Sequence, residues 1–429
     1  MSFDVINHNA KICKFAHLYN DMTVKQARDQ FPILSTTVYG KPLVYLDNAA
    51  TAQRPDSVVR TWEDSVSAGN ANIHRAVHKL ASDATAYYEN TRDFVKGFLN
   101  AAHREEIVFT SGATASINLV AFSFGEAFVR RGDEVIVSVA EHHSNIVPWQ
   151  MMCARKKAVL KVLETDENGV LLPENLEKLI SHKTKIVAIS HISNVLGLVN
   201  PVHQLIAISH KYGVPVLVDG AQGIVHQDVD VQGMDCDFYA FSGHKLYAAT
   251  GTGVLYGKKK WLDAIPPYMG GGEMIETVRF SGTTYAKSPA KFEAGTQNLN
   301  AVPTLVPAIE FVQECRKSPE IAAEQAAITE YVLNALSADS RIKLYGVPRR
   351  TEDKIPLFSI SVEGAHHEDL ALLLDKMGVA VRSGQMCAEP LMDHCGVTGM
   401  LRASFAPYNT LEEAKYFIGC LNRAINMLV

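Results

Sequence analysis

Short apolar runs alternate with longer stretches of helical spacing between residues 43 and 257. The runs are rich in β-branched residues and comprise 44–46, 107–109, 135–137, 160–163, 186–189, 214–218, 238–241 and 253–256. Residues 75–102, 113–131 and 201–213 lie between them and carry apolar positions at helical spacing. Unbroken apolar strands that alternate with amphipathic helices are typical of a parallel sheet covered on both faces. The pattern therefore predicts an α/β fold with its ligand site at the carboxyl ends of the strands.

The pattern changes after about residue 300. A long helical stretch, 301–338, precedes strands expected at 356–362, 379–382 and 401–404 and helices expected at 367–377 and from 410 onward. Near the N-terminus, Thr23-Val-Lys-Gln26 fits a capping box for a short helix that would stop near Pro32. We expect three parts: an N-terminal segment (1–40) that packs with the small domain, a large α/β domain (41–305) and a small C-terminal α+β domain (306–429).

Composition narrows the class of protein. The chain has 429 residues and a net charge of −5, which argues against a nucleic-acid or membrane-surface role. It has no apolar run of about 18 residues that could span a membrane, and its first residues lack the apolar stretch of a secretory signal. The seven cysteines are scattered without a CxxC pair, unlike a disulfide framework or a zinc site. We therefore expect a cytoplasmic protein with free thiols and no bound metal.

Two of the expected strands end in residues suited to binding charged groups. The strand at 107–109 runs into Thr110-Ser-Gly-Ala-Thr114 at the start of a helix. Small residues there expose backbone N–H groups to an anion such as phosphate, although Thr110 or Ser111 could instead provide ordinary N-capping. The strand at 214–218 ends at Asp219, a carboxylate that needs a partner if it is buried. A cationic ring nitrogen would be such a partner, and a helix cap or a salt bridge is the alternative.

A third strand, 238–241, delivers Ser242-Gly-His-Lys245 at its end. A lysine that is partly desolvated in a cleft has a lowered pKa and becomes a nucleophile for aldehydes, whereas most lysines are solvated. Ser242 and His244 add donors for a phosphate. A lysine for an aldehyde, an aspartate for a pyridinium nitrogen and a helix N-terminus for a phosphate together describe pyridoxal phosphate. The combination predicts an enzyme that holds this cofactor as a Schiff base on Lys245.

From about Leu43 onward the chain resembles enzymes of the class V aminotransferase fold. Within that fold it is similar to SufS-type (group II) cysteine desulfurases, which are related to selenocysteine lyase. The matching segments are 45–51, 72–75, 110–114, 141–149, 242–245, 292–296, 382–387, 402–404 and the strand that ends in Asp219. So many matches in order are much more specific than any one motif. The resemblance implies a pyridoxal-phosphate transferase fold of the aspartate aminotransferase type, with a mainly parallel seven-stranded sheet.

The resemblance also implies which residues bind the cofactor. Lys245 would form the Schiff base, Asp219 would pair with the pyridine nitrogen, and His142 would stack on the ring and move protons. The phenolic oxygen of the cofactor, or the substrate, would be bound by Asn194 and Gln222. The cofactor and its phosphate would be contacted by Ala113, Thr114, Ser242, His244 and, from the partner subunit of a homodimer, Thr296.

The implied reaction converts L-cysteine to L-alanine. Arg402 would clamp the substrate carboxylate, which suits the bidentate geometry of a guanidinium. Arg382, Asn194 and His74 would complete the substrate site. Lys245 would remove the Cα proton, and the thiolate of Cys387 would attack the substrate sulfur and become a persulfide. A thiolate is required because a thiol is a poor nucleophile, and Arg382 and Arg402 would favour it if the fold brings them together.

Several sequence features bear on Cys387. It lies in a loop-like segment, which argues against the buried structural role of most free cysteines. Many relatives have a histidine where this chain has Met386, a difference that affects the tuning of the thiol. Cys395 is an alternative acceptor without those flanks. The short stretch from Cys387 to Arg402 resembles group II enzymes, which depend on a separate sulfur acceptor, so we expect a SufE- or SufU-like partner and an iron–sulfur scaffold.

Other functions are compatible with parts of this pattern. Selenocysteine lyase could use the same thiol and pocket. An aminotransferase for a small amino acid would have no need of the thiol. A non-catalytic scaffold of the same fold would have no chemical need for Lys245, Asp219 and His142 together.

Overall fold

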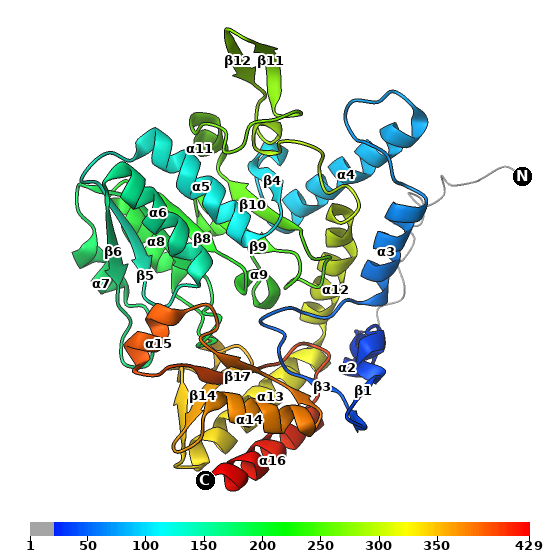
Figure 1. Cartoon of the computed structure of the whole chain (residues 1–429), viewed down its shortest axis with the longest axis vertical. Coiled ribbons are helices and arrows are strands. Elements are labelled where there is room, and N and C mark those ends of the chain that lie inside the picture. Colours follow the sequence, from blue (N-terminus) through cyan, green and yellow to red (C-terminus); the bar gives the residue numbers. More distant parts are fainter. Residues whose placement is uncertain (1–20) are drawn as a thin grey trace, which may run out of the picture.

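The computed structural model describes residues 21–429 (Figure 1). Cys13 and the first residues, on which the prediction about a secretory signal rests, lie outside this range. The described part contains a seven-stranded sheet, a four-stranded sheet and three two-stranded pairs. The four-stranded sheet and its helices form the lower part of Figure 1, and the seven-stranded sheet lies above them.

The large sheet has the strand order β4-β10-β9-β8-β7-β5-β6. Its strands are β4 (Ile107–Thr110), β5 (Glu134–Ser138), β6 (Val159–Leu163), β7 (Thr184–Ser190), β8 (Val216–Asp219), β9 (Phe238–Ser242) and β10 (Gly253–Gly257). β10 runs antiparallel to both of its neighbours, and the other pairs are parallel. The expected mainly parallel seven-stranded sheet is therefore confirmed.

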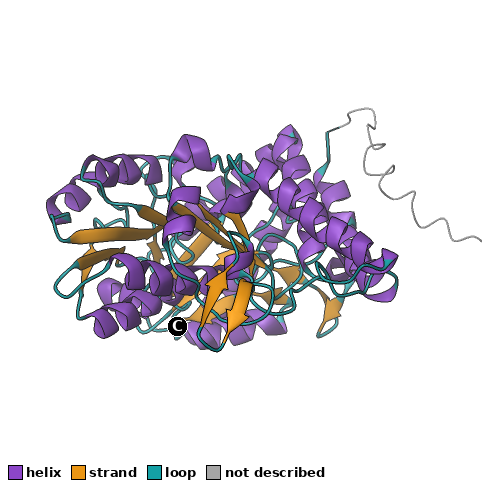
Figure 2. Cartoon of the chain, turned by 90° about the horizontal axis from the view of Figure 1, so that it is seen from above, coloured by secondary structure: helices purple, strands orange, loops and turns teal. Residues whose placement is uncertain are grey.

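Helices cover both faces of this sheet (Figure 2). Leu217 belongs to an apolar cluster that includes α5 (Ala113–Phe128) and α6 (Val147–Lys156). Its neighbours Val216 and Val218 belong to the cluster on the other face, beside α4 (Lys79–Phe98), α8 (Val202–Lys211) and α12 (Leu305–Lys317). Because successive side chains of a strand point to opposite faces, an unbroken apolar run is needed to fill both clusters.

The apolar run at 44–46 behaves differently from the other seven. It forms β3 (Val44–Tyr45), which pairs in parallel with β15 (Val379–Ala380) and stays outside the large sheet. Val44 and Leu46 pack in the cluster of the C-terminal part. A segment from early in the chain thus lies next to the C-terminal sheet and brings the following residues, 47–51, close to both sheets.

The C-terminal sheet is antiparallel throughout, in the order β13-β14-β17-β16. Its strands are β13 (Ile342–Tyr345), β14 (Leu357–Val362), β16 (Arg382–Gly384) and β17 (Met400–Ser404). Three helices pack against it, α13 (Pro319–Ala338), α14 (His367–Lys376) and α16 (Leu411–Leu428). The mixture of strands and helices is the one expected for the end of the chain.

Two expectations for this part need correction. The stretch 301–338 is two helices, because Ser318 caps α13 by accepting from the Ile321 N–H and Pro319 begins it. Proline has no N–H to continue α12. The strand expected at 379–382 is divided between β15 and β16, which belong to different sheets. In contrast, the capping box of Thr23 and Gln26 is confirmed at the start of α2 (Val24–Asp29), which contacts α13.

The remaining elements are short or peripheral. They are β1 (Thr37–Val38), β2 (Lys41–Pro42), α3 (Asp56–Ser67), α7 (Pro173–Leu179), α9 (Gly223–His226), α10 (Val231–Met234), α11 (Lys259–Ala264), the hairpin of β11 (Ile275–Arg279) and β12 (Gly282–Tyr285), and α15 (Glu389–Cys395). No helix within residues 21–429 is long and apolar enough to cross a membrane. The same residues contain no group of three or more His, Cys, Asp or Glu side chains that could hold a metal ion.

Candidate active site

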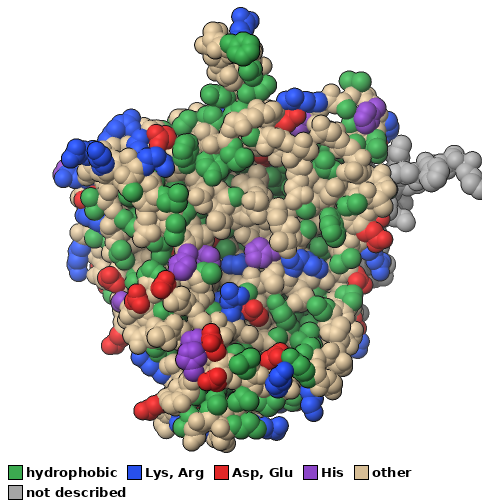
Figure 3. Space-filling view, in the orientation of Figure 1, with side chains coloured by type: hydrophobic (Ala, Val, Ile, Leu, Met, Phe, Trp, Pro, Cys, Tyr) green, Lys and Arg blue, Asp and Glu red, His purple; other side chains and the backbone are tan. Residues whose placement is uncertain are grey.

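A cavity of about 240 Å³ lies where the two sheets face each other. The large sheet contributes residues just after β8 and β9, and the small sheet contributes side chains of β16 and β17. Figure 3 shows a band of histidine and basic side chains across the middle of the molecule, between its upper and lower parts. The cavity is lined by Ala49, Ala50, Ala113, Thr114, His142, Ser144, Ser190, Ile192, Asn194, Asp219, Ala221, Gln222, Ser242, His244, Lys245, Arg382, Met386, Cys387 and Arg402.

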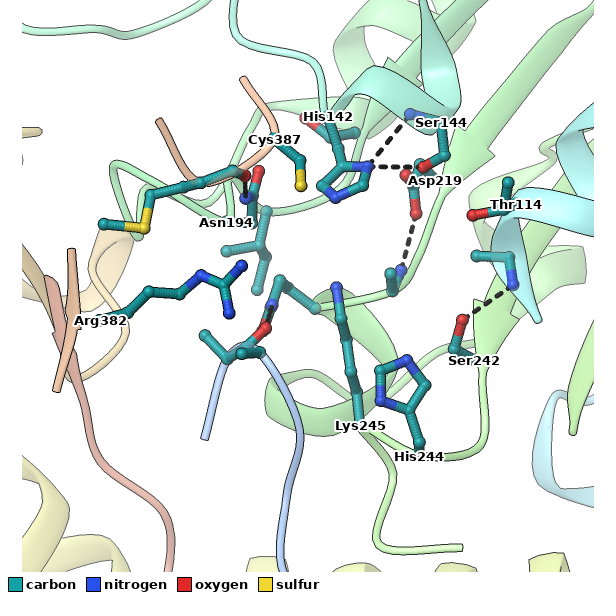
Figure 4. A pocket seen from close by; sticks show the side chains of 18 of the residues that line it. Thr114, His142, Ser144, Asn194, Asp219, Ser242, His244, Lys245, Arg382 and Cys387 are labelled. Atoms are coloured by element: carbon teal, nitrogen blue, oxygen red, sulfur yellow. Dashed lines mark hydrogen bonds between the residues drawn. The ribbon is translucent and has the colours of Figure 1, made fainter. Parts of the chain in front are cut away.

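Asp219 and Lys245 face this cavity from neighbouring parallel strands. The Asp219 carboxylate is buried, accepts one hydrogen bond from the Ala221 N–H (2.9 Å) and forms no salt bridge with any residue of 21–429. Burial raises the pKa of Asp219. Burial also lowers the pKa of Lys245, an effect that the nearby Asp219 charge opposes. The lysine is therefore not a solvated loop residue, and its amine points into the cavity (Figure 4).

The N-terminus of α5 borders the cavity at Ala113 and Thr114. The N-cap residue is Gly112, which has no side chain to cap the helix, so the alternative of ordinary N-capping by Thr110 or Ser111 is not observed. The Ala113 N–H donates to the hydroxyl of Ser242 (2.8 Å). The turn before the helix lies directly over β10, because a Cβ on Gly253 would come within 2.4 Å of the Gly112 Cα. Glycine at that position is what allows the helix N-terminus to reach the cavity.

Two histidines of the cavity are held in the neutral form. Burial, with the Lys245 charge as the next contribution, lowers the pKa of His142 to about 3. The same causes lower the pKa of His244 to about 4. His142 Nδ1 lies 2.7 Å from the Ser144 hydroxyl and accepts from the Ser144 N–H, which orients the ring over the cavity.

Arg402 is almost completely buried between the two sheets. Its guanidinium donates to the Asn194 carbonyl (2.8 Å) and to Asp47 Oδ1 (3.1 Å), while its Nε has no partner in the described part of the chain. The amide of Asn194 donates in turn to the Met386 carbonyl (2.9 Å). The amide of Gln222 donates to the Ala49 carbonyl (2.9 Å). Asn194 and Gln222 therefore border the cavity with one amide hydrogen bond each already made to the backbone.

Cys387 is exposed, and its thiol points into the cavity beside Asn194 and His142 (Figure 4). Arg382 and Arg402 line the same cavity, so the fold does bring both arginines to the thiol's side of it. Met386 has its side chain buried in an apolar cluster with Ala140 and Val195. At this position the chain uses the residue before the cysteine as an apolar anchor.

Two of the predicted site residues, His74 and Thr296, lie outside the active-site cavity. The exposed His74 has its Nε2 3.1 Å from Glu89 Oε1 and lines a separate cavity of about 470 Å³. Thr296 is exposed and is not among the residues around the active-site cavity. The sequence prediction did not single out Asp47 and Ser144, although both lie in segments that carry the family resemblance. The family resemblance could have pointed to both residues, but their contacts depend on the tertiary structure.

A buried histidine next to the cavity gives a testable pH dependence. Burial lowers the pKa of His191 to about 4, compared with about 6.5 in an unfolded chain. Between these values the unfolded chain binds a proton that the folded chain does not, so stability falls as the pH falls through this window. We expect His191 alone to lower the free energy of unfolding by up to about 1.4 kcal/mol per pH unit there. Urea denaturation between pH 7 and 4.5 should show a shallower slope for His191→Asn, and equal slopes would contradict this expectation.

Comparison with known proteins places this geometry in a family. The class V aminotransferase family matches residues 44–417. A cysteine desulfurase of Escherichia coli O127:H6 is 45% identical over 407 residues, which cover 95% of this chain and 99% of that protein. A cysteine desulfurase of Cronobacter sakazakii is 44% identical over the same shares of both chains. Among solved structures, the cysteine desulfurase CsdA from Escherichia coli, in an S-sulfonic acid form, is 39% identical with a TM-score of 0.86, and the alignment covers 96% of this chain and 100% of CsdA. Cysteine desulfurase from Thermococcus onnurineus, in its apo form, is 34% identical with a TM-score of 0.88 over the same shares.

The chain belongs to the class V aminotransferase family of pyridoxal-phosphate enzymes. Within that family it is grouped with the cysteine desulfurases, which match it over nearly its whole length. The fold and the cofactor expected from the sequence are thereby confirmed.

Proposed function

We propose that this enzyme is a group II desulfurase that transfers the sulfur of L-cysteine to Cys387 and releases L-alanine. The observation that carries the proposal is the shared cavity, which the Lys245 amine, the Asp219 carboxylate, the Arg402 guanidinium and the Cys387 thiol all line. An enzyme that only transaminates would have no use for a thiol at this place. Asp219, the partner for a ring nitrogen, and Arg402, the partner for a carboxylate, belong to different sheets, so the cofactor together with its bound substrate would lie between them.

The cavity has the groups that pyridoxal phosphate needs. Among residues 21–429 the Asp219 carboxylate has one hydrogen-bond donor and no salt-bridge partner, so it can pair with the pyridine nitrogen. The N-terminus of α5, with Ala113, Thr114, Ser242 and His244 around it, would hold the phosphate. Lys245 would bind the aldehyde, and His142 would lie against the ring. When bound, the cofactor withdraws electrons from the substrate Cα and so makes its proton acidic.

The residues of the chain account for the remaining steps. Arg402 would bind the substrate carboxylate from its place in the cavity lining, where the Asn194 carbonyl and Asp47 hold its guanidinium. The Lys245 amine, freed when the substrate takes its place, would receive the Cα proton and return a proton to the product. The Cys387 thiolate would attack the substrate sulfur, so that an S–S bond forms while the S–Cβ bond breaks. L-Cysteine and the enzyme thiol thus become L-alanine and an enzyme persulfide, and the atoms balance.

Arg402 offers a test of the substrate orientation. A lysine keeps the charge but loses the planar fork, so it cannot satisfy both the Asn194 carbonyl and a substrate carboxylate. We expect Arg402→Lys to raise the KM for L-cysteine by about 10- to 100-fold, the equivalent of one lost charged hydrogen bond, with a smaller effect on kcat. Steady-state alanine release measures both constants. Arg349→Lys is the matched control, because Arg349 is exposed and pairs with Asp166 far from the cavity. An unchanged KM for Arg402→Lys would remove the proposed clamp.

We propose that the enzyme acts as a cytoplasmic homodimer that passes its sulfur to a separate acceptor. Thr296 and His74 are exposed in the single chain, which leaves both available to a partner subunit. Cys387 is exposed as well, so a SufE- or SufU-like protein could reach its persulfide and supply an iron–sulfur scaffold. The proposed division into an N-terminal segment (1–40), a large domain (41–305) and a small domain (306–429) places the thiol in the small domain.

The direct test uses the purified holoenzyme. We expect L-cysteine and a reductant to yield alanine and sulfide in equal amounts, and mass spectrometry to find one extra sulfur on the peptide that contains Cys387. Size-exclusion chromatography with light scattering reports the oligomeric state. Alanine formation from L-selenocysteine but not from L-cysteine would replace this proposal with selenocysteine lyase activity.

A further inference from the structure

His143 contacts the segment that carries Cys387 through both its backbone and its ring. We name residues 385–389 the cysteine loop. The His143 N–H donates to the Cys387 carbonyl (2.7 Å), and the Glu389 N–H donates to His143 Nε2 (3.0 Å). His143 lies in the turn between β5, a strand of the large sheet, and the helix α6. These two hydrogen bonds therefore join the part of the molecule built on the large sheet to the C-terminal part that carries Cys387. In this contact the ring acts as the acceptor, through Nε2.

The cysteine loop has a backbone that needs such support. Met386 and Cys387 have φ angles of 54° and 55°, so two successive residues with side chains are in the left-handed region. Each such residue costs roughly 1 kcal/mol or more, and it persists only when its surroundings hold it there. With the carbonyls of both residues bonded to the large domain, the conformation that turns the thiol toward the cavity is held from outside the loop.

Other contacts of the loop fix its position through buried side chains and one further hydrogen bond. The Asn194 amide donates to the Met386 carbonyl, and the Met386 side chain is buried beside Val195. Both contacts act on residue 386. After Cys387, Ala388 packs in the same apolar cluster, and the Glu389 N–H adds a hydrogen bond to His143 of the large domain. Hydrogen bonds therefore hold the loop on both sides of Cys387, from Asn194 at the residue before it and from His143 at the residues that follow.

We propose that His143 is a positioning residue that holds the cysteine loop with the Cys387 thiol directed at the substrate sulfur. The inference rests on the proposed role of Cys387 and adds a residue that does not line the cavity. The ring acts as a hydrogen-bond acceptor and takes no part in proton transfer. A glutamine, whose Oε1 reaches about as far as Nε2, can replace it, whereas an alanine cannot.

The test compares His143→Ala, His143→Gln and His394→Ala as holoenzymes in a Cys395→Ser background. His394 is the matched control, because its ring lies at the end of α15 and contacts Thr165 and Glu164 without touching the cysteine loop. Hydrogen–deuterium exchange reports the Glu389 amide, and stopped-flow absorbance separates L-cysteine binding from persulfide formation. The visible cofactor band and the Tm show that each variant is folded.

We expect His143→Ala to exchange the Glu389 amide about tenfold faster, as for the loss of one net hydrogen bond. Persulfide formation on Cys387 should slow by a similar factor, while the spectral change on L-cysteine binding keeps its rate. His143→Gln should restore both values, and His394→Ala should match the parent enzyme. Unchanged exchange of the Glu389 amide in His143→Ala would overturn the proposal. So would losses of persulfide formation in His394→Ala and His143→Gln that equal the loss in His143→Ala. If Cys387 is not the acceptor, the Glu389 amide will still exchange faster in His143→Ala, but no peptide that contains Cys387 will carry a persulfide. Failure of the acceptor assignment is therefore distinguishable from failure of the positioning role of His143.

Discussion

Lys245→Ala is expected to lose the visible Schiff-base absorbance and to lower L-cysteine desulfuration by at least about 10²- to 10⁴-fold, the usual contribution of a positioned acid–base group. The physical reason is that Lys245 combines a cavity position with a pKa lowered by burial, so its amine is more readily unprotonated and nucleophilic than that of a solvated lysine. It also lies one strand away from Asp219, whose charge would balance a cationic ring. Absorbance spectra and alanine assays of the purified variant measure both effects.

Two control variants make this prediction sharp. Lys211→Ala removes an exposed lysine that pairs with Glu177 and should change nothing. Lys354→Met is the stricter control, since Lys354 is another buried lysine that burial makes a candidate nucleophile, with its pKa lowered to about 7. Its amine, however, donates to the carbonyls of Leu196 and Gly346 and faces a different cavity. A Schiff-base band that survives in Lys245→Ala and disappears in Lys354→Met would contradict the assignment.

The sequence predicted the parts of the site that depend on the order of strands. Asp219 and Lys245 follow apolar runs that become neighbouring parallel strands, and parallel strands bring their carboxyl ends to one edge. The run at 44–46 looked the same as the other runs, yet it pairs with β15. Hydrophobic pattern specifies that a segment is a buried strand, but not which strand it pairs with.

The sequence could not predict the contacts that join the two sheets. Asn194 was expected at the cofactor or substrate, and the structure has its amide bonded to the Met386 carbonyl. The backbone that accepts this bond is left-handed at Met386 and at Cys387, a conformation that no propensity favours for these residue types. Likewise, the sequence shows only that Met386 stands where many relatives have a histidine. The structure adds that its side chain makes a buried apolar contact. Such features follow from the packing of the whole molecule and not from local sequence.

Cys387→Ser is expected to keep the visible cofactor band and the spectral change on adding L-cysteine, but to lose desulfuration on the order of a thousandfold or more, as when a catalytic nucleophile is removed. Serine has nearly the same shape, so binding at Arg402 and Lys245 is unaffected. Its hydroxyl is almost never ionised at neutral pH and so cannot attack the substrate sulfur. Single-turnover assays of alanine and persulfide, with spectra recorded in parallel, separate the lost step from the retained one.

Cys395→Ser is the matched control, because it changes the other cysteine of the same region. Cys395 ends α15 and is partly buried, and burial raises its pKa, so its thiol is less often ionised than a thiol in water. It does not line the active-site cavity. We expect Cys395→Ser to retain full activity and the persulfide to remain on Cys387. The reverse result would be a fully active Cys387→Ser and an inactive Cys395→Ser. It would require helix α15 to unwind toward the cavity. The acceptor would then be a thiol that the fold keeps away from the substrate, and not the one on the exposed loop.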